Sequence, residues 1–405
     1  MSQNLTNLPP GKPPRWTPHK FPPTLQEDNG QYFRDKNAAR YPKHPMEPAV
    51  IASLDTDPTL PTKTNIMACG STLGNLLRFV RSQDKTFRIM VEKVNNTVFL
   101  IRRENSPTEL IEGVRGYGHS FPEAYTTWDA DVKGSATHQR IIRYKFGGLD
   151  IVVRFEADGY IKDPKNGSVH PTPSKGSIQP SVDDIVNALA TSNVTTKLPK
   201  SDTRLQVKKG GSSVEQKAIF DLKTRSMYTK FTKDHLAEEL PRLWVSQTPN
   251  FILAFHTRGV FKAEDIQVRD VRTYVKKWEK DHVTELGRLA ALIHRVVDMV
   301  SSAPGSRMEI SHQMLGRLDI REQCPGSGDV LSAEVRGRWA ELAGREGGGE
   351  VDGLGLNEKS ELREKGAGSD GDNSDEGGGI EWDEKIDDFT ACSSESCGYC
   401  GKCSY

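Results

Sequence analysis

Four segments in the N-terminal half place β-branched and aromatic residues between polar ones, a pattern that predicts β-strands. They form two pairs, each joined by a turn-forming dipeptide, Asn95-Asn96 in the first pair and Gly147-Gly148 in the second. Strands joined by such two-residue connections are typical of β-hairpins. The four segments are 87–94, 97–103, 140–146 and 149–161.

Apolar residues at helical spacing mark three longer segments. Leu73, Leu76, Leu77 and Val80 form one stripe, and Ser71 stands where a helix cap is favoured, so we predict a helix over 71–81. The same spacing predicts helices near 233–247 and over 271–300, and a short helix over 181–190. Strands are predicted over 217–224 and 250–256. This mixture favours an α/β (α+β) fold with a mixed central β-sheet flanked by helices.

Composition changes along the chain and predicts its domain organisation. Residues 1–60 are rich in proline and are expected to form an arm that packs on the domain of residues 61–320. Residues 162–214 are polar and are interpreted as an insertion between two strands that would otherwise be neighbours. Residues 321–405 are rich in Gly, Glu, Asp and Ser, which predicts a disordered acidic tail.

Charge and hydropathy restrict the class of protein. Basic and acidic residues each number 55, so nucleic acid could bind only through local patches. The polar start "MSQNLTNLPPGKPP" does not resemble a signal peptide, and no apolar run approaches the roughly 18 residues of a membrane span. We therefore predict a protein of the nucleus or cytoplasm that is neither secreted nor bound to a membrane.

The stretch "AIFDLKTRSM" (218–227) places an acid and a base on one face of a strand. Asp221 and Lys223 are two residues apart, as are Glu156 and Asp158 at the end of an earlier strand, so each pair projects to one side. If the two strands pair, the carboxylates converge, and such an oxygen cluster suits Mg²⁺ or Mn²⁺. A nearby lysine could orient a water molecule for hydrolysis of a phosphodiester. The alternative is a cross-strand ion pair on a solvated face.

Four stretches resemble, in order, the decapping exoribonuclease family, DXO-type enzymes that hydrolyse RNA 5′ ends. "GHSFPE" (118–123) is similar to the family's glutamate-bearing turn, "FEAD" (155–158) to its ExD and "FDLKT" (220–224) to its ExK. "LPRLWVSQTPNFILAFHTRGVF" (240–261) is similar to the family's helix and apolar strand. The likeness covers about residues 67–300.

The resemblance implies a restriction-endonuclease-like core and a metal-dependent hydrolase that removes RNA 5′ ends by decapping or pyrophosphohydrolysis, with 5′–3′ exoribonuclease activity as an extension. It implies Mg²⁺ or Mn²⁺ as cofactor, and RNA 5′ ends and a partner 5′–3′ exoribonuclease as partners. The metal ligands implied are Glu123, Asp158, Asp221 and Glu156. Lys223 and Glu156 would position the attacking water, and Gln247 would contact that water or the substrate.

The chain departs from the family pattern at several positions. Pro122 is an extra residue before Glu123, Asp221 replaces a glutamate, and Ala68–Ser71 lacks the arginine that the family places near the RNA. The basic stretch 197–211 in the insertion could grip phosphates instead, or be a solvated loop. The alternative function is therefore a catalytically degraded relative that binds RNA or a partner nuclease.

The C-terminal end carries a cysteine cluster with C-x4-C-x2-C-x2-C spacing. Four thiolates suit tetrahedral Zn²⁺, although structural zinc sites usually separate two pairs of cysteines more widely. A zinc knuckle and a reduced tail are the two interpretations. The candidate ligands are Cys392, Cys397, Cys400 and Cys403.

Overall fold

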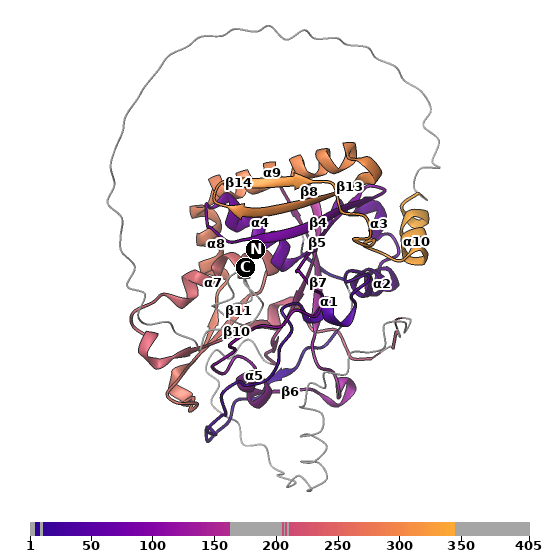
Figure 1. Cartoon of the computed structure of the whole chain (residues 1–405). Helices are drawn as coiled ribbons and strands as arrows, with labels where there is room; N and C mark the ends of the chain where they lie inside the picture. The colour runs from indigo at the N-terminus through magenta and orange to yellow at the C-terminus, as the bar shows by residue number, and fades with distance from the viewer. Residues whose placement is uncertain (1–4, 9–10, 163–204, 206, 209, 345–405) are drawn as a thin grey trace, which may run out of the picture.

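The computed structural model describes residues 5–8, 11–162, 205, 207–208 and 210–344, and it contains two β-sheets (Figure 1). The strands of the larger sheet, in spatial order, are β1 (Thr6–Asn7), β7 (Gln139–Phe146), β8 (Leu149–Glu156), β3 (Ile66–Cys69), β5 (Thr97–Arg102), β4 (Phe87–Val94), β13 (Arg307–Met314) and β14 (Arg317–Arg321). The strands of the smaller sheet are β12 (Ile266–Asp270), β11 (Asn250–His256), β10 (Ile219–Ser226), β9 (Gly159–Tyr160), β2 (Arg15–Trp16) and β6 (Thr126–Thr127).

Strand β3 shows how the larger sheet separates two cores. Ile66 and Ala68 belong to one buried cluster and Met67 and Cys69 to the other, as the two-residue period of a strand requires. The first cluster includes residues of helices α4 (Gly70–Val80), α7 (His235–Ser246), α8 (Arg272–Asp281) and α9 (Val283–Ser302). The second includes residues of α2 (Glu47–Thr56), α3 (Leu60–Lys63) and α10 (Ala333–Gly344). Helices thus cover both faces of the sheet.

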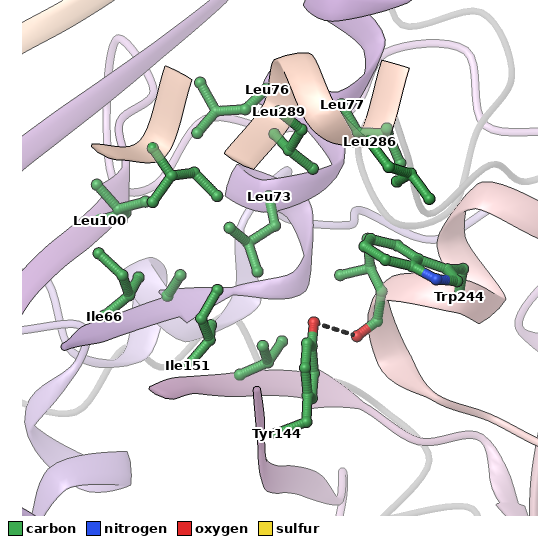
Figure 2. Packing of buried hydrophobic residues seen from close by; sticks show 14 of the residues in the cluster. Ile66, Leu73, Leu76, Leu77, Leu100, Tyr144, Ile151, Trp244, Leu286 and Leu289 are labelled. Atoms are coloured by element: carbon green, nitrogen blue, oxygen red, sulfur yellow. Dashed lines mark hydrogen bonds between the residues drawn. The ribbon is translucent and has the colours of Figure 1, made fainter. Parts of the chain in front are cut away.

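Helix α7 connects the larger sheet with the smaller one. Trp244 packs among the leucines of α4 and α9, and the Tyr144 hydroxyl of β7 donates a hydrogen bond to the Val245 carbonyl at 3.0 Å (Figure 2). After α7 the chain enters β11, which pairs in parallel with β10. These contacts fix the position of α7 relative to both sheets.

The predicted fold class is confirmed, because mixed sheets are flanked by helices. Both predicted hairpins form, as β4 with β5 and β7 with β8. The helix predicted over 271–300 is instead two helices, since His282 leaves helical geometry with φ −117° and ψ 30°. Its backbone N–H still bonds to the Trp278 carbonyl at 3.0 Å, so it ends α8 and begins α9.

The predicted disorder beyond residue 321 is wrong for residues 333–344, which form α10. The Trp339 side chain is fully buried and packs edge-on against Phe99 of β5. Arg336 of α10 pairs with the buried Glu92 of β4, whose second oxygen accepts a hydrogen bond from the Val330 N–H at 2.8 Å. The buried side chains of Val335 and Trp339 and the ion pair to Glu92 therefore hold this helix on the second core, although its composition is polar.

The N-terminal segment is more structured than a proline-rich arm. It supplies β1 to the larger sheet, β2 to the smaller sheet, and helices α1 (Lys36–Arg40), α2 and α3. Val50 and Leu54 of α2 are fully buried, so the segment belongs to the second core. In the part of the chain that the structure describes, no helix is long and apolar enough to cross a membrane. The helix predicted over 181–190 and the four C-terminal cysteines lie outside the described residues.

Candidate functional site

The two acidic segments predicted to converge are brought together where the chain passes from one sheet to the other. Strand β8 ends at Glu156 in the larger sheet, and the chain enters β9 of the smaller sheet at Gly159. Strand β9 pairs with β10, with Phe220 opposite Gly159. A Cβ added to Gly159 would lie 2.7 Å from the Pro14 carbonyl oxygen, so only glycine allows this approach. The Asp158 carboxylate consequently accepts a hydrogen bond from the Leu222 N–H at 2.7 Å.

A cavity of about 320 Å³ lies at this junction. Its wall combines basic, acidic and aromatic side chains. Its basic residues are Arg34, Lys36, Arg78, Arg102, Arg154, Lys223 and Arg242. Its acidic residues are Asp35, Glu123, Glu156, Asp158 and Asp221. Its phenylalanine and tryptophan residues are Phe33, Trp128 and Phe155. Glu123, Glu156, Asp158, Asp221 and Lys223, all predicted from the sequence, thus share one cavity.

The Asp221 carboxylate is bound by a guanidinium group. Arg242, from α7, contacts both Asp221 oxygens, and its Nε donates to Glu239 Oε2 at 2.8 Å. Lys223 Nζ lies 3.8 Å from the other Glu239 oxygen, which is also 3.7 Å from Arg225. Asp221, Lys223, Arg225 and Glu239 are each 5% exposed or less, so this is a buried ionic network.

The charges of the network perturb two carboxyl groups in opposite directions. Burial, together with the negative charge of Asp221, raises the pKa of Asp158 to about 7, although Arg242 partly offsets this. Burial alone would raise the pKa of Glu239, but Lys223, Arg242 and Arg225 outweigh it and lower that pKa to about 2. Near neutral pH, Asp158 is therefore partly protonated while Glu239 is ionised.

The predicted metal site does not fit a divalent cation in this arrangement. Both Asp221 oxygens are bound to Arg242, and Glu156 faces Lys36, with Nζ and Oε1 4.0 Å apart. Within the described ranges, no group of three or more His, Cys, Asp or Glu residues is arranged to hold a metal ion. The carboxylates meet as predicted, but basic side chains supply the positive charge there.

Glu123 approaches the cavity from the short helix α5 (Ser120–Tyr125). Burial and the charge of Asp28 raise its pKa. Asp28 accepts hydrogen bonds from the backbone N–H groups of His119 and Ser120 and lies 3.1 Å from His119 Nδ1. Asp28 of the N-terminal segment thus holds the turn that carries Glu123.

Gln247 does not line the cavity, whereas the preceding Ser246 does. Gln247 caps α7 in the left-handed region, with φ 51°, and its side-chain amide donates to the Trp244 carbonyl at 2.5 Å. The left-handed backbone of Gln247 and this hydrogen bond direct its side chain back toward α7.

Arg154 of β8 lies beside Ala68–Ser71, the segment that lacks the arginine of the decapping exoribonuclease pattern. It is the strand partner of Cys69, and its Nη2 donates to Cys69 Sγ at 2.9 Å. Cys69 begins α4 without a side-chain cap. Arg154 is 7% exposed, its Nε has no hydrogen-bond partner, and no carboxylate among the described residues pairs with it. The cavity wall therefore contains a buried cation next to the N-terminus of a helix.

The sequence interpretation missed Arg242, Glu239 and Arg154. Glu239 and Arg242 are three residues apart on a predicted helix, a spacing typical of ion pairs. Arg154 is two residues before Glu156, so it shares the face of the strand that carries Glu156. Both spacings can be read from the sequence, but neither shows which residues of other segments these side chains contact.

The described fold is similar to that of solved Rai1 and Dxo1 proteins. Rai1 of Scheffersomyces stipitis matches with a TM-score of 0.50 and 11% identity, over 84% of this chain and 97% of that protein, which shows a shared fold. Rai1 of Candida albicans, in complex with pU5 and Mn²⁺, has a TM-score of 0.45 at 10% identity, over 73% and 80% of the two chains. Dxo1 of K. lactis, in complex with manganese, has a TM-score of 0.40 at 8% identity, over 73% and 76%.

Sequence comparison, unlike the comparison of folds, identifies a family for this chain. Among curated proteins, no sequence matches the chain. A family model described as a domain of unknown function matches residues 1–312, which is most of the chain and includes every described residue of the cavity wall. The chain therefore belongs to the family DUF8563.

Proposed function

We propose that the cavity binds the phosphorylated 5′ end of an RNA strand. The observation that carries this proposal is Arg154, a buried cation in the cavity wall without a carboxylate partner among the described residues. A buried charge without a counterion is costly, so such a position favours an anionic ligand. The adjoining N-terminus of α4 adds the positive end of a helix dipole, which also favours phosphate.

RNA as the ligand class is inferred from two further features. The cavity wall carries Phe33, Trp128 and Phe155, which could stack a base. The order of sequence segments resembles that of the decapping exoribonucleases, whose ligands are RNA 5′ ends. The expected partner exoribonuclease, like the nuclear or cytoplasmic location, stays a prediction from the sequence.

Binding of short RNAs that differ only at the 5′ end tests the proposal. Fluorescence anisotropy would compare a 3′-labelled pentanucleotide that carries a 5′-monophosphate with the same strand ending in a 5′-hydroxyl. The proposal predicts at least about tenfold tighter binding of the phosphorylated strand, equivalent to about 1.4 kcal/mol. Equal affinity for the two strands would contradict it.

Metal-dependent hydrolysis of the same RNA ends is a second candidate function. The observation that favours it is that Glu156, Asp158, Asp221 and Lys223 line one cavity, as the sequence pattern predicted. Product analysis with 5′-triphosphate, 5′-monophosphate and NAD-capped RNAs in Mg²⁺ or Mn²⁺ tests it. Release of product by the wild type, lost in both Asp221→Ala and Lys223→Ala, would support hydrolysis; no product from any strand would leave binding as the function.

A further inference from the structure

Arg242 occupies the centre of a carboxylate cluster. Its guanidinium contacts Asp221 on one side and Glu239 on the other, and the charge of Asp158 also acts on it. These acids come from the cavity-lining β10, from α7 and from the β8–β9 connection. A single cation thus connects acidic groups from three parts of the fold.

The balance of charge explains why a cation is needed there. Asp221 and Glu239 are both nearly buried, and two carboxylates brought together without a counterion would repel each other and lose hydration. Lys223 and Arg225 approach Glu239 at 3.7 to 3.8 Å, but Arg242 is the group that contacts both acids. Its planar fork matches the two Asp221 oxygens, a geometry that a lysine could not reproduce.

From these contacts we infer that Arg242 is a built-in cation that takes the place of a divalent metal ion, and that an uncharged residue in its place lets Mn²⁺ bind between Asp221 and Glu239. Carboxylate oxygens suit Mn²⁺ or Mg²⁺, and Arg242 now contacts carboxylates of both β10 and α7. The inference concerns buried charges alone, so it stands or falls independently of RNA binding.

The experiment titrates the full-length protein with Mn²⁺ in the absence of RNA, with free Mn²⁺ followed by electron paramagnetic resonance. The samples are the wild type, Arg242→Met, which keeps an unbranched side chain and removes the guanidinium charge, and the double variant R242M/D221N. We expect R242M to bind one Mn²⁺ at least about tenfold more tightly than the wild type, and D221N to abolish that gain. The same Mn²⁺ concentration should raise the melting temperature of R242M and not that of the wild type, because a ligand that binds only the folded state stabilises it.

Two results would overturn the inference. One is a wild type that binds Mn²⁺ as tightly as R242M and loses that binding in Asp221→Asn, because the guanidinium would then not replace the metal. The other is a folded R242M with no gain in Mn²⁺ affinity. If R242M does not fold, Arg242→Gln provides the same comparison, since its amide can still donate hydrogen bonds to Asp221. Mn²⁺ binding by the wild type that is lost in Asp221→Asn would contradict the inference even if neither Arg242 variant folds.

Discussion

Arg242 of α7 binds both carboxylate oxygens of Asp221 in β10, although the two residues lie in different layers of the molecule. The sequence of β10 suggests that Asp221 is a metal ligand, whereas in the structure Asp221 forms an ion pair with Arg242. Asp221 does face the cavity, but it faces a guanidinium there. The junction of the two sheets is held together by an ionic network, and the adjoining cavity wall carries both basic and acidic side chains.

Loss of the Arg242 charge should strongly destabilise the fold. Removing one partner from a buried ion pair leaves the other charge uncompensated, so R242M should lose about 3–5 kcal/mol of unfolding free energy. Denaturant unfolding followed by circular dichroism would measure this loss in metal-free buffer. The matched control is Arg338→Ala, which breaks the exposed pair with Asp55 and should cost at most about 1 kcal/mol. Similar losses in the two variants would show that the Arg242 pair contributes no more than a surface pair.

Asp158 should contribute less to the stability of the protein as the pH rises from about 4 to about 7, because its carboxyl group loses its proton in the folded state. The native state keeps a proton on Asp158 up to its pKa of about 7, whereas the unfolded chain releases it near the ordinary value of 3.8. At Asp158 the native state thus binds more protons over this range, so the contribution of this residue to the unfolding free energy falls with increasing pH. Asp158→Asn should have a flatter profile between pH 4.5 and 7. An unchanged slope in this variant would show that Asp158 does not have the raised pKa.

Arg154 should contribute most of the preference for a 5′-phosphate. Arg154→Gln keeps a hydrogen-bond donor but removes the charge, so its affinity for the phosphorylated strand should fall about tenfold or more. Its affinity for the 5′-hydroxyl strand should change much less. The matched control is Arg317→Gln on the β13–β14 hairpin, where the arginine is exposed and paired with Asp319. Equal losses for both RNA strands would indicate a general effect on the fold, and no loss would remove Arg154 from the site.

Helix α10 should be required for full stability. Trp339→Ala removes a fully buried side chain that packs on Phe99, and such truncations cost about 3–5 kcal/mol. Thermal unfolding of this variant would be compared with Arg338→Ala, a change on the same helix at an exposed side chain. If the two melting temperatures agreed, α10 would not be docked on the second core.

The sequence predicts the convergence of Asp158 with Asp221 on the condition that their two strands pair, and the structure supplies that pairing. A strand has a fixed two-residue period, and the segments on either side of the insertion pair as neighbours, so the facing carboxylates could be inferred. The position of Arg242 could not be inferred in the same way. Its three-residue spacing from Glu239 identifies a helix face, but the direction of that face depends on how α7 packs against the larger sheet through contacts such as that of Tyr144.

Helix ends and polar helices account for the other differences. The resemblance of residues 240–261 to a family motif predicts that Gln247 belongs to the site. In the structure its left-handed backbone at the end of α7 directs the side chain toward the Trp244 carbonyl. Helix α10 has few apolar residues and lies close to a glycine-rich segment, so its composition indicated disorder. The buried Val335 and Trp339 and the ion pair to Glu92 hold it on the second core, and none of these contacts can be seen from local sequence.

The metal dependence of the 5′-phosphate preference tests the central claim most directly. The affinity of the wild type for 5′-phosphorylated and 5′-hydroxyl RNA would be measured first in EDTA and then in 1 mM Mn²⁺, with the RNA analysed for cleavage afterwards. If basic side chains bind the phosphate and Arg242 replaces the metal, the preference should be present in EDTA and unchanged by Mn²⁺, with the RNA intact. A preference or a cleavage product that appears only with Mn²⁺, and is lost in Asp221→Ala, would contradict this account and support a metal-dependent hydrolase.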